Sequence, residues 1–337
     1  MSTKPSHNHP YDQLTPDCIL DALESEGFQP NGSLLALNSY ENRVYQIALE
    51  ENGKSAENQL SYVIAKFYRP ERWSDAAILE EHAFALELAA AEIPVVAPLT
   101  INGKTLFEFN HFRYAIFPRQ GGRTPELDQP ETLKQLGRFL GRIHAVGAQR
   151  PFTDRPRLTV QSFGIDSLNF LLERDFIATE VRSNYLHAAE EALQLATQAF
   201  EALLPRNIRL HGDCHPGNML WTDKGPHFVD LDDCRSGPAV QDLWMMLSGD
   251  SDEMARQFRY ILEGYETFFE FDRAELALIE PLRTLRLIHY SAWLARRWHD
   301  PAFPQHFPWF DSPRYWEDQM ITLREQVERL QMPGLKL

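Results

Sequence analysis

The chain has few cysteines and lacks the long apolar runs of membrane proteins. Its three cysteines, Cys18, Cys214 and Cys234, are odd in number and scattered, which supports neither a disulfide framework nor a cysteine-based zinc site. No apolar stretch reaches the length that crosses a bilayer, and the polar first residues do not have the pattern of a secretory signal. We therefore expect a reduced, cytoplasmic protein.

Positive charge is also scarce. The chain has 33 lysines and arginines against 48 aspartates and glutamates, which gives a formal net charge of −15. This balance argues against non-specific nucleic-acid binding, which depends on a cationic surface, and against docking on an anionic membrane. The 337 residues, 43% of them hydrophobic, have an ordinary globular composition and suffice for two lobes with real cores.

The apolar pattern divides the chain into a strand-rich part and a helical part. Strand-like runs lie at 34–37, 44–49, 62–68, 105–109 and 112–117. One long helix is expected from Ser74 or Asp75 to Ala91. The predicted organisation is a mobile tail at 1–14, a strand-rich lobe at 15–117, a hinge at 118–122 and a helical lobe at 123–337. The expected fold class is α+β.

Residues 208–233 hold the densest set of chemically active side chains. Asp213 is followed after five positions by Asn218 and after twelve more by Asp230, and apolar runs on either side of Thr222 to Gly225 predict a β-hairpin. The hairpin would bring Asn218 and Asp230 together as oxygen ligands for Mg²⁺, and would leave Asp213 free to accept a proton from a hydroxyl. The alternative is a tight loop in which these side chains cap backbone groups.

Lys66 lies in the apolar run 62–68, where an ammonium group is costly unless it meets an anion. In a nucleotide site that anion would be a phosphate. The alternative is an edge-strand lysine whose charged end reaches water. Glu80 and Glu81, in the first turns of the long helix, are both candidates to hold Lys66 in an ion pair, and either could instead be a solvated helix charge.

Two motifs carry a resemblance to a known family. The sequence His-Gly-Asp-x-His-x-x-Asn from His211, followed by Val-Asp-x-x-Asp from Val229, resembles the protein-kinase-like fold in its aminoglycoside phosphotransferase and choline kinase branch. Four further segments, at 37–45, 66–73, 237–244 and 300–304, are similar to the bacterial stress response kinase A family. The resemblance covers nearly the whole chain. It implies two lobes, a small antiparallel sheet with one long helix and a larger, mainly helical lobe.

The resemblance implies an ATP- and Mg²⁺-dependent Ser/Thr protein kinase that is cytoplasmic, monomeric and tied to envelope and oxidative stress. It assigns Asp213 as the catalytic aspartate, and Asn218 and Asp230 as the Mg²⁺ ligands, with Asp230 also catalytic. It assigns Lys66 to the phosphates and Glu81 to the ion pair that orients Lys66.

The loop over the phosphates departs from the kinase pattern because it has no Gly-x-Gly-x-x-Gly. We expect Asn38, Ser39 and Asn42 to cradle the phosphates instead, since asparagine tolerates unusual backbone angles and Ser39 offers a hydroxyl and an amide. Ser39 is equally open to the interpretation of a simple turn residue. The resemblance gives Asp242 and His211 supporting roles in the catalytic loop.

Two other functions compete with the protein kinase. One is a small-molecule kinase that acts on an amino alcohol, a sugar or an aminoglycoside, since the fold does not decide the substrate. Its acceptor site would include side chains of the second lobe, or else these are helix core: His289, Tyr290, Trp293, Arg296, Arg297 and Trp298. The other is a nucleotide-binding pseudokinase that serves as a scaffold, which the complete set Lys66, Asp213, Asn218 and Asp230 disfavours.

Overall fold

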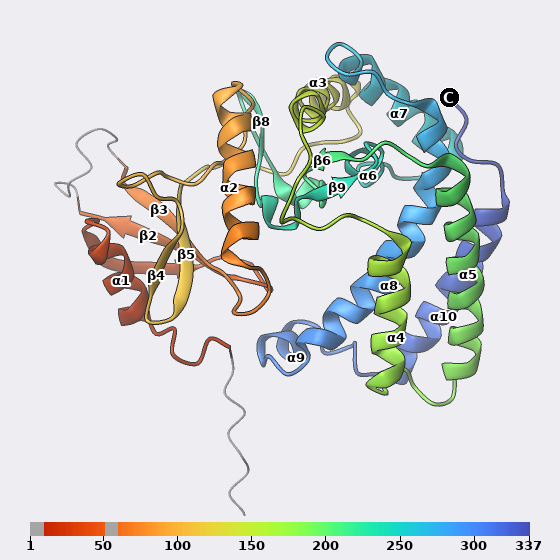
Figure 1. Cartoon of the computed structure of the whole chain (residues 1–337), viewed down its shortest axis with the longest axis horizontal. Helices are drawn as coiled ribbons and strands as arrows, with labels where there is room; N and C mark the ends of the chain where they lie inside the picture. Colours follow the sequence, from red (N-terminus) through yellow and green to blue (C-terminus); the bar gives the residue numbers. More distant parts are fainter. Residues whose placement is uncertain (1–9, 51–59) are drawn as a thin grey trace, which may run out of the picture.

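The protein consists of two lobes in a computed structural model that describes residues 10–50 and 60–337 (Figure 1). The first lobe contains a five-stranded sheet, and the second is mainly helical with two short two-stranded ribbons. The α+β class predicted from the sequence is confirmed. The sheet ends at Pro118 and the first long helix of the second lobe begins at Pro130, while the exact lobe and hinge limits stay predictions.

Lys66 lies in the middle of the first lobe's sheet. The strands, in spatial order, are β1 (Pro30–Ala36), β2 (Arg43–Leu49), β3 (Tyr62–Phe67), β5 (Phe112–Pro118) and β4 (Phe107–Phe109). All neighbouring pairs are antiparallel, and Lys66 on β3 is paired with Val44 on β2 and Ala115 on β5. Because β3 has a neighbour on both sides, the edge-strand interpretation does not apply to Lys66.

The two faces of the sheet have different roles. Successive side chains of a strand point to opposite faces. On β3, Val63 and Phe67 are buried in the core that α1 (Pro16–Ser25) covers. Lys66 therefore points to the other face, where α2 (Asp75–Ala90) stands between the sheet and the second lobe (Figure 1).

The start of the described chain is packed against the first lobe. Tyr11 and Leu14 are buried in the core beneath α1, so packed structure begins before residue 15. The rest of the predicted mobile tail, residues 1–9, lies outside the described residues. The hydroxyl of Thr15 then accepts a hydrogen bond of 3.2 Å from the backbone N–H of Cys18, which caps α1.

The second lobe is built from helices that pack closely. They are α3 (Pro130–Gly147), α4 (Asp166–Glu173), α5 (Arg182–Leu203), α6 (Gln241–Trp244), α7 (Ser251–Tyr265), α8 (Ile279–Arg297), α9 (Ala302–His306) and α10 (Pro313–Gln331). Between α3 and α7, a Cβ atom added to Gly264 would lie 1.9 Å from the backbone oxygen of Lys134, so only glycine permits this approach. None of the helices in the described ranges is long and apolar enough to cross a membrane.

Short ribbons and turns shape the region between the lobes. The ribbons are β6 (Ile208–Leu210) with β9 (Arg235–Gly237), and β7 (Met219–Thr222) with β8 (Gly225–Phe228). The second ribbon is the hairpin predicted from the sequence. Short helical turns lie at Gln161–Ile165, Pro216–Asn218, Leu231–Asp233 and Arg273–Leu278.

Candidate active site

A cavity of about 540 Å³ lies between the lobes, and the predicted site residues other than Asp213 line it. Ser39, Lys66, Glu81, Asn218 and Asp230 all line it. They come from the loop before β2, from β3 and α2, and from the two ends of the β7–β8 hairpin. Apolar side chains on opposite walls complete the cavity, among them Val44, Ile64, Ala85, Phe117 and Leu220.

Lys66 is the buried cation of this cavity. Its Nζ lies 3.1 Å from Asp230 Oδ1, 3.1 Å from Asp232 Oδ1 and 3.6 Å from Glu81 Oε1. Burial alone would lower the pKa of Lys66, but the charges of Asp230, Asp232 and Glu81 outweigh it and raise that pKa well above its ordinary value. The ammonium group is therefore fully charged and fixed, as a phosphate-binding cation must be.

The two adjacent glutamates of α2 point to different places. The Glu81 carboxylate is buried against Lys66, and burial raises its pKa to about 7. The Glu80 carboxylate accepts hydrogen bonds of 2.6 to 2.7 Å from three consecutive backbone N–H groups, at residues 153–155. Glu81 is thus the glutamate that pairs with Lys66, while Glu80 joins α2 to the loop that follows α3.

The side chain of Asp242 fixes the backbone of the loop that carries Asp213. The two carboxylate oxygens of Asp242 accept hydrogen bonds from the backbone N–H groups of His211 (2.7 Å) and Gly212 (2.8 Å). His211 itself reaches the backbone oxygen of Val229 at 2.9 Å, next to Asp230. Through these contacts the backbone on both sides of the site is fixed, so Asp242 and His211 lie where the supporting roles place them.

Asp213 does not itself line the cavity, but it contacts the lining residue Asn218 and lies between Arg286 and His215. Arg286 Nη1 lies 2.6 Å from its Oδ1, and His215 Nε2 lies 3.4 Å from its Oδ2. Burial alone would raise the pKa of Asp213, but the hydrogen bond with His215 and the charge of Arg286 lower it well below its ordinary value. Asp213 is therefore a carboxylate at neutral pH, able to orient a hydroxyl and accept its proton.

Asn218 and Asp230 form an oxygen-rich corner of the cavity. The side-chain amide of Asn218 donates to the backbone oxygen of Asp213 at 3.0 Å, which leaves its Oδ1 without a hydrogen-bond donor in the described chain. Asp230 has a left-handed backbone (φ 60°), which is strained for a residue other than glycine, and its side chain is 51% exposed. One carboxylate and one amide oxygen suit Mg²⁺, which keeps several waters and takes further oxygens from phosphates.

The loop between β1 and β2 meets the cavity only in part. Asn38 and Ser39 line it, as expected for phosphate contacts. The expectation for Asn42 is wrong, because this side chain is buried and its Oδ1 accepts a hydrogen bond of 3.0 Å from the backbone of Arg69. Its role is to brace the loop, so any phosphate contact from this loop falls to Asn38 and Ser39.

Two important partners were not identified from the sequence, Arg286 and Asp232. Arg286 lies on α8, 73 positions after Asp213, and no spacing links the two residues. Asp232 is buried and contacts both Lys66 (3.1 Å) and Arg72. The sequence signal for such partners was the group of three acids at Asp230, Asp232 and Asp233. Carboxylates this close together repel one another unless cations lie beside them.

The aromatic and basic side chains proposed for an acceptor site are mostly engaged elsewhere. His289 is stacked on Phe163 at 4.1 Å, and Trp293 donates to Glu41 at 2.6 Å. Arg297 also binds Glu41, at 2.9 Å. Among the six, Tyr290 is the large aromatic side chain that stays exposed. The interpretation as packed helix side chains therefore fits better than a shared acceptor pocket.

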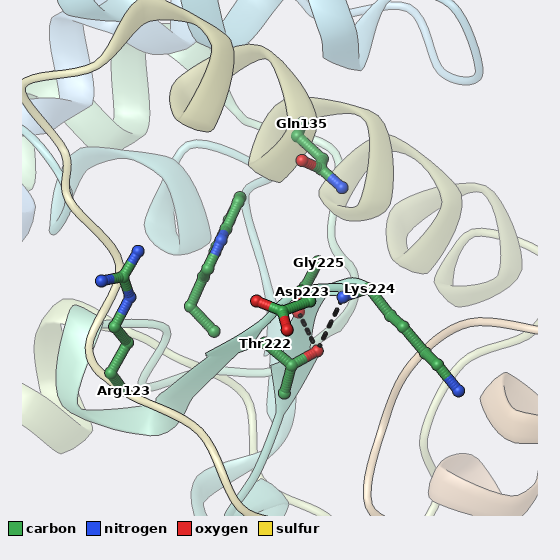
Figure 2. Close-up of a pocket in the computed structure, with 7 residues that line it drawn as sticks. Arg123, Gln135, Thr222, Asp223, Lys224 and Gly225 are labelled. Carbon is green, nitrogen blue, oxygen red and sulfur yellow. Dashed lines mark hydrogen bonds between the residues drawn. The ribbon is translucent and has the colours of Figure 1, made fainter.

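A second hollow lies at the far tip of the β7–β8 hairpin (Figure 2). Its walls include Arg123, Gln135 and Lys224, and the turn itself is closed by hydrogen bonds of Thr222 with Gly225 and Lys224. None of the predicted site residues lines it. The chemistry therefore belongs to the cavity between the lobes.

Comparisons with known proteins agree with this geometry. A model described as the phosphotransferase enzyme family matches residues 33–279. Stress response kinase A of Escherichia coli (strain K12) is 46% identical over 327 residues, which are 97% of this chain and 97% of that protein. The serine/threonine protein kinase RdoA of Salmonella typhimurium shows the same identity and coverage.

Solved structures show the same fold. An amicoumacin kinase in complex with AMP-PNP and Ca²⁺ has a TM-score of 0.69 at 20% identity, covering 95% of this chain and 94% of its own. A microcompartment-associated aminopropanol kinase has a TM-score of 0.69 at 17% identity, covering 96% of this chain and 99% of its own. The two-lobed, protein-kinase-like fold predicted from the sequence is confirmed.

Proposed function

The chain belongs to the phosphotransferase enzyme family, and we propose that it is a protein kinase that transfers the γ-phosphate of ATP to Ser and Thr hydroxyls. The resemblance to stress response kinase A stated from the sequence is confirmed by relatives that match almost end to end. The observation that carries the proposal is the contact between Asp213 and Asn218, because Asn218 lines one cavity together with Lys66 and Asp230.

The apolar walls and the charged floor of the cavity suit the two ends of ATP. The adenine would lie between side chains such as Val44, Ala85 and Leu220, which line opposite walls. The triphosphate would extend toward Lys66, which Glu81 and Asp232 hold in place. Since phosphoryl transfer depends mainly on positioning and electrostatic stabilisation, a fixed ammonium group is the chief contribution of this wall.

Asp213 would act on the acceptor. Its carboxylate orients the Ser or Thr hydroxyl for in-line attack and accepts the proton as the new O–P bond forms and the bond to the β-phosphate oxygen breaks, releasing ADP. Asn218 fixes the loop by donating to the backbone oxygen of Asp213. The low pKa of Asp213 keeps this group ionised across the physiological range.

Asn218 and Asp230 would hold a divalent ion, for which we propose Mg²⁺. When bound, Mg²⁺ neutralises charge on the phosphates. Each residue has an oxygen that is accessible to a metal ion. Asn218 Oδ1 accepts no hydrogen bond within the described residues, and about half of the Asp230 side chain is exposed. Lys66 stays neutralised by Glu81 and Asp232.

The relatives and the amino-acid composition support a cellular role, a location and a class of partners for this protein. The name stress response kinase A supports a role in stress, for which we propose envelope and oxidative stress as the conditions. The scarcity of cysteine supports a cytoplasmic location, and the net charge of −15 supports neither nucleic acid nor membrane as a partner. We propose that the protein acts as a monomer on a protein substrate.

An acceptor panel tests this function. The purified protein is incubated with γ-labelled ATP and Mg²⁺, together with a general protein acceptor or with amino alcohols, sugars and aminoglycosides. The proposal predicts label on Ser or Thr of the protein acceptor. Label on a small molecule alone would assign the protein to small-molecule phosphorylation, and tight ATP binding with no transfer to any acceptor would make it a pseudokinase.

A further inference from the structure

Arg286 contacts the carboxylate of Asp213, the group that would accept the proton of an acceptor hydroxyl. It extends from α8 to the catalytic loop, and its Nη1 lies 2.6 Å from Asp213 Oδ1. The side chain of Arg286 is 41% exposed and that of Asp213 is 24% exposed, so solvent reaches both groups. Within residues 10–50 and 60–337, Asp213 is the residue with which the guanidinium group of Arg286 forms a hydrogen bond and an ion pair.

His215 reinforces the basic character of this position. Its Nε2 lies 3.4 Å from the other carboxylate oxygen of Asp213, and the side chain is 36% exposed. Both oxygens of the proposed base therefore have a partly exposed basic neighbour. An acceptor hydroxyl must come within hydrogen-bond distance of one of these oxygens, so it arrives beside Arg286 or His215.

An acceptor hydroxyl that binds Asp213 Oδ1 would share that oxygen with Arg286 or displace it. The hydroxyl competes with Arg286 for Asp213 Oδ1, and a guanidinium group that loses its carboxylate needs another one. Arginine presents five N–H donors in a planar fork, which matches a carboxylate in a two-point contact. A carboxylate next to the acceptor hydroxyl would supply that contact and leave Asp213 free for the hydroxyl.

A cationic acceptor would meet the opposite situation. Its charge would lie close to Arg286, and like charges brought together cost free energy. The nearby carboxylate of Asp233 would not offset this repulsion, because Asp233 is already paired with Arg72 at 2.9 Å and with Arg235 at 2.6 Å.

We propose that Arg286, together with His215, selects acceptors with a carboxylate beside the hydroxyl, so that the preferred substrate is a Ser or Thr flanked by Asp or Glu. The inference rests on the proposed protein kinase function and specifies its substrate. Arg286 is then a specificity-determining residue that binds the acceptor. Tyr290, one turn further along α8 and exposed, extends the same surface.

Three peptides of equal length test the inference. Each has one central Ser, flanked by acidic residues, by alanine or by lysine, and kcat and KM are measured for each with ATP and Mg²⁺. We expect the wild-type protein to favour the acidic over the lysine peptide by about ten- to hundredfold in kcat/KM, the range of a hydrogen bond to a charged group. The preference should shrink as salt screens the exposed charges.

Arg286 variants locate the origin of the preference. Arg286→Gln should bring the three peptides close together, mainly by raising KM for the acidic one, and Arg286→Glu should reverse their order. Arg314→Gln is the matched control, since Arg314 is 87% exposed on α10 and pairs only weakly with Asp318 at 3.8 Å. It should leave the wild-type order intact. Nucleotide affinity and thermal melting of each variant show whether it is folded.

The outcomes separate the inference from the function. If the wild-type protein labels the lysine peptide as well as the acidic one, the substrate preference is wrong and the kinase function stands. If Arg286→Glu slows all three peptides equally through kcat, Arg286 only positions Asp213, and the inference fails. If no peptide or protein is labelled while a small molecule is, the proposed function fails and the inference with it.

Discussion

Glu80 and Glu81 are neighbours on α2 with different tasks, which makes them a natural pair for mutation. Glu81→Gln removes the carboxylate that fixes Lys66, and we expect transfer to fall by about 10²-fold, the cost of misplacing a catalytic group. Glu80→Gln should leave the transfer rate near wild type. It should lower the free energy of unfolding by about 1 kcal/mol, because its carboxylate accepts three backbone hydrogen bonds.

Turnover and chemical denaturation of the two variants check this assignment. A loss of transfer in Glu80→Gln that equals the loss in Glu81→Gln would show that the ion pair with Lys66 has no special role. Both changes replace glutamate with glutamine of the same size at adjacent positions of one helix, so side-chain size and helix propensity cannot explain a difference between them.

Glu275 allows a prediction on the pH dependence of stability. It is buried beside α6, where it accepts a hydrogen bond of 2.9 Å from the backbone of Val240, and burial raises its pKa from 4.5 to about 7. Between these values the folded protein holds a proton that the unfolded chain has lost. Stability should therefore fall as pH rises from 5 to 7.5, by about 2 kcal/mol for this one group.

Glu275→Gln should remove this contribution. The variant should gain stability relative to the wild-type protein as the pH rises through that window, and urea denaturation at a series of pH values measures the difference. Glu81, whose pKa is also raised to about 7, contributes equally to both proteins and cancels. A difference between the two proteins that does not change with pH would contradict the prediction.

Residue types and spacing predicted much of the candidate site. Lys66, Asn218 and Asp230 stand in one cavity because each lies in a motif whose local structure, a strand or a hairpin, follows from nearby sequence. Arg286 escaped prediction because its contact with Asp213 depends on how helix α8 packs against a loop that is distant in the sequence. Among the several arginines of α8, no sequence feature distinguishes the one that faces the catalytic loop.

The loop between β1 and β2 contacts helix α8 of the second lobe through Glu41. Glu41 in this loop accepts from Trp293 at 2.6 Å and from Arg297 at 2.9 Å, both on α8. It also pairs with Arg69 at 3.0 Å, so one carboxylate joins the loop, the first lobe and the second lobe. A loop without the glycine pattern is thus held in place by side-chain contacts.

This contact gives a prediction for nucleotide binding. Glu41→Gln should release the loop that places Asn38 and Ser39 at the cavity, and ATP affinity should fall by about ten- to thirtyfold, the cost of a weakened charged network. Glu108→Gln, an exposed change on β4, serves as the control. A fluorescent nucleotide titration measures both, and equal affinity in the two variants would show that the loop does not depend on Glu41.

Element boundaries were predicted best where the pattern is local. The hairpin at 219–228 and the long helix of the first lobe appear as expected. Helix α6 (Gln241–Trp244), in contrast, is only a single turn. There the side chain of Asp242 holds the catalytic loop, a long-range contact that helical spacing alone does not reveal.

At the scale of the whole molecule, charged contacts join the two lobes. Arg43 and Arg69 of the first lobe reach Asp300 of the second, at 3.1 Å and 2.5 Å, and Arg72 reaches Asp233 at 2.9 Å. In a chain with a net charge of −15, these three arginines therefore lie between the lobes, where they neutralise carboxylates of the second lobe.

The molecule should be a monomer in solution. Its exposed large apolar side chains, such as Leu35, Leu79, Leu204 and Ile321, lie on separate elements and do not suggest a shared interface. Light scattering coupled to size exclusion should give a mass near 39.0 kDa across a range of concentrations. A mass near twice that value would contradict the prediction.

The most direct test of the account is the transfer rate of Asp213→Asn beside the wild-type protein. Both are supplied with γ-labelled ATP, Mg²⁺ and a protein acceptor, and label on Ser and Thr is counted over time. Loss of the base predicts a rate lower by about 10²- to 10⁴-fold, roughly 3 to 5 kcal/mol, with ATP affinity and melting temperature near wild type. A folded Asp213→Asn protein that transfers phosphate at the wild-type rate would remove Asp213 from the mechanism and contradict the assignment of this site.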